Sequence, residues 1–143
     1  MEGRVTAAAC ATERQQRRVK KALIADDSAS NRELLRTMLA HFGFEVTEAV
    51  DGLQALELAP DSHPDLIILD IQMPRLDGYG ALAKLRELEQ FRSTPIIALT
   101  AFAMDGDFER GRAAGFSDYV TKPVGLKKLR MVLERSLGLR SPW

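Results

Sequence analysis

The spacing of hydrophobic residues along the chain changes repeatedly between Ala22 and about Leu137. Short apolar runs alternate with longer stretches in which apolar residues recur every three or four positions. The short runs are typical of strands, and the longer stretches are typical of amphipathic helices. The runs that predict strands are Ala22–Ala25, Phe44–Thr47, Leu66–Leu69, Ile96–Leu99 and Asp118–Val120.

Polar residues and glycines mark the ends of the intervening helices. Serine and aspartate cap helix N-termini through their side-chain oxygens, and such residues precede the first three helical stretches. The candidate caps are Ser28 or Ser30, then Asp51, then Asp77. Gly43 and Gly115 fall just past helical stretches, where glycine commonly ends a helix.

Strands that alternate with helices indicate a parallel sheet that is covered by helices on both faces. The segments LIILD and IIALT lack polar alternation, as expected of central strands buried on both sides. The sequence therefore predicts an α/β fold with five parallel strands and five helices. Ligands of such sheets bind beyond the carboxyl ends of the strands, so the residues there are the candidate functional residues.

Composition and charge fit one folded domain with short tails. The chain has 143 residues, of which 45% are hydrophobic and 28% are charged. Residues 1–21 carry six Lys or Arg against two Glu, so we expect a basic N-terminal tail or linker there. The predicted domain spans 22–138, with a C-terminal tail at 139–143. Residues 22–143 carry 14 basic against 18 acidic side chains, which argues against a broad nucleic-acid footprint.

Cysteine usage and hydropathy bear on location. Cys10 is the single cysteine, so no intrachain disulfide can form and a reducing compartment fits. No stretch approaches the roughly 20 apolar residues of a membrane span, and the N-terminus lacks the apolar core of a secretory signal. We therefore expect a cytoplasmic protein with no membrane partner.

Acidic, hydroxyl and basic residues follow the predicted strands. They are Asp26 and Asp27 after the first strand, Asp70 after the third, Thr100 after the fourth and Lys122-Pro123 after the fifth. Three carboxylates at one sheet edge repel one another unless a cation joins them. Mg²⁺, a hard cation that prefers oxygen ligands, suits such an open site beside a phosphate.

The same residues have complementary chemistry toward phosphate. A carboxylate can attack phosphorus to form an aspartyl phosphate, and Asp70 is the best nucleophile because it ends the most apolar strand. Asp26 and Asp27 are then better placed to hold the metal. Lys122 supplies a point charge for a phosphoryl oxygen, and Thr100 supplies a hydroxyl that can hydrogen-bond the same oxygen.

Residues 22–137 resemble a bacterial two-component response-regulator receiver domain. The matching segments are ALIADDS, LIILDIQMPRLDG, IIALTA and DYVTKP, and their order and spacing agree with the family. The stretch from Thr100 to Pro123 is particularly similar to single-domain receivers and to receivers of hybrid sensor kinases. The resemblance implies a flavodoxin-like (βα)5 fold with strand order 2-1-3-4-5.

The resemblance also implies roles for individual residues. Asp70 would accept phosphate, with Mg²⁺, or Mn²⁺ in its place, held by Asp26, Asp27, Asp70 and the backbone carbonyl of Gln72. Thr100 and Lys122 would contact the phosphoryl group, Thr100 and Tyr119 would form the switch, and a cis peptide would precede Pro123. Phe102 could slow self-dephosphorylation by excluding water.

The implied partners are a sensor histidine kinase or histidine phosphotransfer protein and a downstream effector, without direct DNA binding. Phosphorylation would alter the surface of the fourth helix (about Asp105–Ala114), fifth strand and last helix, which could also form a homodimer. The domain would catalyse only its own phosphoryl transfer and dephosphorylation. Neither a free-standing regulator nor a piece of a larger kinase is excluded.

Other interpretations of the same residues exist, and some of them need residues that the sequence lacks. Asp26 and Asp27 could be a helix cap and its solvated neighbour, and Tyr119 could be an ordinary sheet residue. A haloacid-dehalogenase-type phosphatase would need a second Asp where Gln72 stands. A flavodoxin-like cofactor binder would need a phosphate loop where the two carboxylates stand. A degenerate receiver could dock partners without being phosphorylated.

Overall fold

The computed structural model describes residues 20–101 and 107–138, and Phe102 and both predicted tails beyond these residues lie outside it. The strands are β1 (Lys20–Ala25), β2 (Phe44–Ala49), β3 (Leu66–Asp70), β4 (Ile96–Thr100) and β5 (Asp118–Thr121). The helices are α2 (Ala29–His41), α3 (Gly52–Ser62), α4 (Gly78–Glu87), α5 (Asp107–Ala114) and α6 (Leu126–Leu137), with a short 3-10 helix, η1 (Glu89–Phe91).

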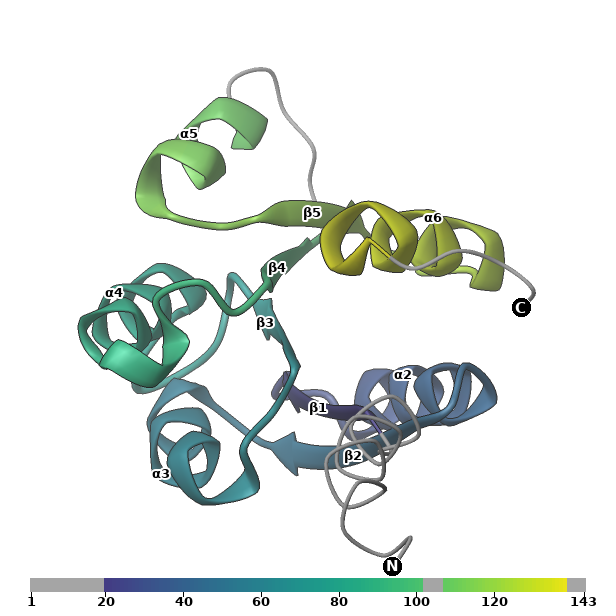
Figure 1. Ribbon diagram of the computed structural model, residues 1–143, viewed down its shortest axis with the longest axis horizontal. Helices are drawn as coiled ribbons and strands as arrows, with labels where there is room; N and C mark the ends of the chain where they lie inside the picture. The colour runs from purple at the N-terminus through teal and green to yellow at the C-terminus, as the bar shows by residue number, and fades with distance from the viewer. Residues whose placement is uncertain (1–19, 102–106, 139–143) are drawn as a thin grey trace, which may run out of the picture.

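The five strands form one parallel sheet in the order β2-β1-β3-β4-β5, as predicted. Helices α2 and α6 cover one face, and α3, α4 and α5 cover the other (Figure 1). None of the helices among the described residues is long and apolar enough to cross a membrane.

Alternate residues of each strand supply the two cores. Ile24 and Ile68 pack against α2 and α6, whereas Leu23 and Ile67 pack against the helices of the other face. Every residue of β3 and β4 is buried, so these strands lack the polar alternation of a half-exposed strand. Full burial of one such Leu or Ile contributes about 1.5–3 kcal/mol.

The predicted helix boundaries are confirmed. The side chains of Ser28, Asp51 and Asp77 accept backbone N–H groups at the starts of α2, α3 and α4. Ser28, rather than Ser30, is the first cap because Ser30 already lies inside α2. Gly43 has a positive φ of 91° after α2, which glycine adopts without steric cost.

Strand β1 begins at Lys20, two residues before the predicted start of the domain. Lys20 and Lys21 pair in register with Phe44 and Glu45 of β2. The Lys21 N–H also donates to the Asp65 carboxylate at 2.9 Å. Backbone pairing needs no apolar side chain, so the hydrophobic pattern does not reveal this extension.

Arg86 joins the end of α4 to the loops around β4 and β5. Its guanidinium donates to the carbonyls of Phe91 at 2.6 Å, Thr94 at 2.7 Å and Gly115 at 2.9 Å. Hydrogen bonds from a charged donor to backbone carbonyls are stronger than neutral ones. This side chain therefore stabilises the edge of the domain opposite the carboxyl ends of the strands.

Candidate functional site

The carboxyl ends of β1, β3, β4 and β5 bring the predicted residues to one edge of the sheet. Asp26 follows β1 and is fully buried, Asp70 ends β3 and is 3% exposed, and Asp27 is exposed. One carboxylate oxygen from each of these three residues lies within 4.8 Å of the other two. The predicted acidic cluster therefore exists in the folded chain.

Lys122 links two of the carboxylates. Its Nζ lies 2.7 Å from Asp70 Oδ2 and 3.2 Å from Asp26 Oδ2. The Lys122 N–H donates to the Thr100 carbonyl at 2.7 Å, which fixes the end of β5 beside the end of β4. The peptide bond between Lys122 and Pro123 is cis, as the family resemblance implied.

Burial and the contact between Asp70 and Lys122 have opposite effects on the pKa values of the two residues. Burial raises the pKa of the Asp70 carboxyl, and neighbouring Asp26 raises it further, while hydrogen bonds from Lys122 and the Gln72 N–H act in the opposite direction without cancelling the rise. Burial alone lowers the pKa of Lys122, but its contacts with Asp70 and Asp26 outweigh burial and raise that pKa. Lys122 is therefore held as a cation.

The residues present fit a divalent cation. Asp26 Oδ2 is buried, and its partner among the described residues is the Lys122 ammonium, in an ion pair of 3.2 Å. Lys122 is shared between Asp26 and Asp70, so one positive charge faces a cluster of three carboxylates, and a divalent cation would compensate the remaining negative charge. The donors are all hard oxygens, as Mg²⁺ requires, and exposed Asp27 leaves one side of the cluster open to water.

The loop between β3 and α4 closes one side of the cluster. The Gln72 N–H donates to Asp70 Oδ1 at 3.0 Å. Gln72 and Asp27 both line an open cleft of about 610 Å³ beside the carboxylates. A Cβ on Gly78 would lie 2.6 Å from the Asp70 carbonyl oxygen, so the loop can return across β3 only because this residue is glycine.

Thr100 and Tyr119 lie on the neighbouring strands β4 and β5. Thr100 ends β4 with 8% exposure and pairs in register with Thr121 of β5. Tyr119 is half-buried on β5 and lines a hollow of about 190 Å³ with residues of α6. Tyr119 packs against the core on the face of α3, α4 and α5, and it also lines a small hollow there with Gly111, Arg112 and Phe116.

Three contacts around the site were not predicted. Arg32 donates to the Asp26 carbonyl, and Arg75 donates to the Asp51 carboxylate at 2.7 Å from the β3–α4 loop. The Arg110 guanidinium lies 4.9 Å from the centre of the Tyr79 ring, beside the open cleft. Charged residues on amphipathic helices and in loops look like ordinary solvated positions, so the sequence carries no signal for these contacts.

Comparisons with known proteins agree on one family. The model of the response regulator receiver domain matches residues 22–134. The chain is 39% identical over 119 residues to the polar-differentiation response regulator DivK of Brucella ovis, a match that covers 83% of this chain and 97% of that protein.

Solved structures agree on the fold. The chemotaxis response regulator CheY4 of Vibrio cholerae superposes with a TM-score of 0.78 and 33% identity, over 82% of this chain and 98% of CheY4. The receiver domain of the sensor histidine kinase PA1611 from Pseudomonas aeruginosa superposes with a TM-score of 0.76 and 38% identity, over 84% and 98% of the two chains. That receiver has a magnesium ion coordinated in its active-site cleft.

Proposed function

This chain belongs to the response regulator receiver domain family, and from that premise we propose that it is a switch activated by phosphorylation of Asp70. Receiver domains are signalling switches rather than classical turnover enzymes. The observation that carries the proposal is the buried Asp70 carboxylate, 2.7 Å from Lys122 and within 4.8 Å of two further carboxylates. The phosphoryl donor is a sensor histidine kinase or a histidine phosphotransfer protein.

Each residue at the site has a role in phosphoryl transfer. An Asp70 oxygen forms the new bond to phosphorus while the bond between phosphorus and the donor nitrogen breaks. Lys122 holds a phosphoryl oxygen through its charge, and the Thr100 hydroxyl donates to an oxygen of the same group. Asp26, Asp27, Asp70 and the Gln72 carbonyl hold Mg²⁺, with Mn²⁺ as a substitute, and the ion supplies charge neutralisation. The magnesium ion of the similar PA1611 receiver supports this assignment.

Phosphorylation then changes the surface formed by α5, β5 and α6. The phosphoryl group adds a charge of about −1.5 to −2 and new partners for Thr100 and Lys122. Thr100 moves toward it, and Tyr119 turns into the space that Thr100 leaves. The altered surface binds a downstream effector protein or a second copy of the chain. We place this signalling in the cytoplasm, without direct DNA binding.

A phosphotransfer assay tests the proposal. The protein is incubated with an autophosphorylated histidine kinase, with Mg²⁺ or with EDTA, and phosphoprotein is resolved on a phosphate-affinity gel. Wild type and Asp61→Asn, which changes an exposed carboxylate far along α3, should be labelled only with Mg²⁺. Asp70→Asn should not be labelled. A wild type that no histidine kinase labels would favour the degenerate receiver.

The switch needs a separate measurement. Beryllofluoride with Mg²⁺ mimics the phosphoryl group, so adding both should shift the backbone amide resonances around Thr100 and Tyr119. The Asp70→Asn variant serves as the control and should show no such shifts. If wild-type resonances change only beside Asp70, the Tyr119 switch is wrong although phosphorylation can still occur.

A further inference from the structure

The Arg32 side chain reaches from α2 back to the loop that carries the two leading carboxylates. Its Nη1 donates to the backbone carbonyl of Asp26 at 2.7 Å, and its side chain is only 15% exposed. Among the described residues, the hydrogen bonds and ion pair of the Arg32 side chain go to Asp26 and Glu48 and not to the Asp70 carboxylate or Lys122, so its effect on the site passes through the backbone.

The Asp26 carbonyl belongs to the peptide unit that joins Asp26 to Asp27. The peptide units before and after it are each held by a hydrogen bond. The Asp26 N–H donates to the Ala49 carbonyl at 3.1 Å, and the Ser28 N–H donates to Asp26 Oδ1 at 2.9 Å. The Ser28 hydrogen bond closes a ring that contains the peptide between the two aspartates, so it limits the rotation of that peptide plane without contacting its carbonyl. The hydrogen bond from Arg32 restrains the same plane at its carbonyl oxygen, and rotation of that plane would move both carboxylates relative to Asp70.

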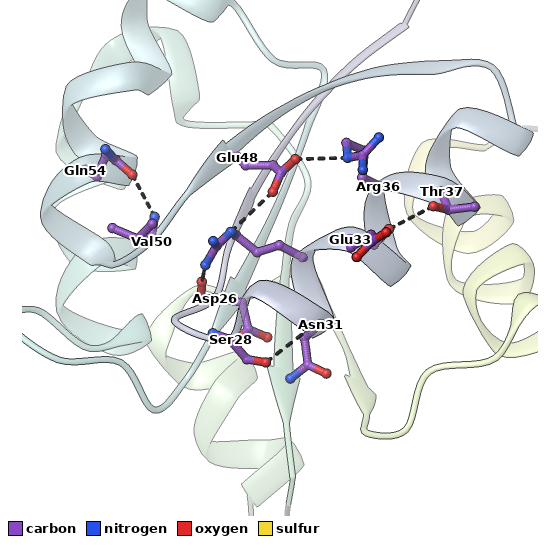
Figure 2. Close-up of polar contacts among 10 residues, drawn as sticks. Asp26, Ser28, Asn31, Glu33, Arg36, Thr37, Glu48, Val50 and Gln54 are labelled. Atoms are coloured by element: carbon purple, nitrogen blue, oxygen red, sulfur yellow. Dashed lines mark hydrogen bonds and ion pairs between the residues drawn. The ribbon is translucent and has the colours of Figure 1, made fainter.

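Glu48 on β2 holds Arg32 in this orientation. Arg32 Nε donates to Glu48 Oε1 at 3.2 Å, and the second carboxylate oxygen lies 3.0 Å from Arg36 Nε. Figure 2 shows these contacts leading from Asp26 to Glu48 and on to Arg36. Arg36 is 49% exposed and contacts the Glu48 carboxylate oxygen that does not bind Arg32. It is therefore a matched control for Arg32.

We propose that Arg32, oriented by Glu48, is a positioning residue that sets the divalent-cation affinity of the acidic cluster. The inference rests on the proposed function, in which Asp26 and Asp27 hold Mg²⁺. A planar guanidinium can bridge a carbonyl and a carboxylate at once, whereas a lysine ammonium has no such fork. Partners that orient metal ligands typically change metal affinity about 10- to 100-fold when removed.

Magnesium titration followed by ¹H–¹⁵N NMR at low temperature tests the inference on the complete chain. Arg32→Met keeps the aliphatic stem and should raise the Mg²⁺ Kd about 10-fold, the low end of that range, because Arg32 acts on a ligand's backbone. Arg36→Met should stay within about 2-fold of wild type, since it leaves the Arg32 contact in place. Before Mg²⁺ is added, Arg32→Met should also shift the Asp27 amide resonance more than Arg36→Met does.

Thermal unfolding with EDTA separates positioning from a general structural role. If Arg32→Met lowers the melting temperature but keeps the wild-type Mg²⁺ Kd, the inference is overturned. Glu48→Gln retains the Arg32 charge and should raise the Kd by a smaller factor, which keeps the test available if Arg32→Met does not fold. A wild type that binds no Mg²⁺ would instead overturn the proposed metal site, and the inference with it.

Discussion

Replacing Asp26 by Asn should stabilise the protein in the absence of Mg²⁺, although the change removes one partner of Lys122. At an effective dielectric constant of about 20, the Asp70 carboxylate repels Asp26 by at least about 3 kcal/mol, because their nearest oxygens lie within 4.8 Å of each other. Exposed Asp27 is screened by water and adds about 1 kcal/mol. The attraction lost with Lys122 at 3.2 Å is about 5 kcal/mol, so these pair energies nearly cancel.

Desolvation then decides the sign. Asp26 is 0% exposed, and holding a carboxylate away from water costs several kcal/mol even after the protein relaxes. The neutral amide avoids most of that cost and can keep the hydrogen bond from the Ser28 N–H. Lys122 retains Asp70 at 2.7 Å, so no cation is left unpaired. We expect a net gain of about 1–3 kcal/mol in the free energy of unfolding.

Urea unfolding monitored by circular dichroism, with EDTA or with Mg²⁺, measures the effect. Mg²⁺ at ten times its Kd should stabilise wild type by about 1.4 kcal/mol. It should stabilise Asp26→Asn much less, because one ligand is gone. Asp61→Asn, outside the site, should respond to Mg²⁺ as wild type does. An Asp26→Asn variant less stable than wild type in EDTA would refute the electrostatic account.

Three further predictions concern stability. Hydrogen bonds from the α3 backbone and from Arg75 lower the pKa of Asp51, so its ionised form adds stability that is lost as pH falls below about 4; the urea midpoints of wild type and Asp51→Asn should converge there. Gly52→Ala should cost about 1–3 kcal/mol in urea unfolding because its Cβ would strike the carbonyl oxygen of the β3–α4 loop, whereas Gly111→Ala, with only ordinary contacts, should gain about 0.5–1 kcal/mol. Arg86→Met should lower the unfolding free energy by about 2–4 kcal/mol, since four backbone carbonyls lose this donor.

The main residues of the site could be predicted because each follows a contiguous apolar run. Asp70 follows LIIL and Thr100 follows IIAL, and both runs are buried strands in the centre of the sheet. Parallel pairing places the ends of such strands together whatever the length of the chain between them. Their chemistry then follows from residue type: the carboxylates repel, and Lys122 is the cation that joins two of them.

The start of β1 could not be predicted in the same way. Lys20 and Lys21 extend β1 through backbone pairing with β2 at residues whose side chains carry no apolar pattern. The arginines near the site are hidden for a related reason. Arg75 reaches Asp51 across 24 positions, and Arg32 bonds a carbonyl, a group that every residue carries. Hydrophobic periodicity reports which side chains are buried but not which backbone group a long polar side chain will meet.

This difference divides the site into two kinds of residue. The charges of Asp26, Asp70 and Lys122 follow directly from their residue types, whereas Arg32 and Gly78 fix the conformation of the loops beside these side chains. Arg32 holds the peptide that joins the two leading aspartates, and Gly78 lets the β3–α4 loop pass against the Asp70 carbonyl. A change in either loop would move the carboxylates that we propose as metal ligands without removing one. We therefore expect receivers with the same carboxylates and lysine to differ in cation affinity where the contacts that hold these loops differ.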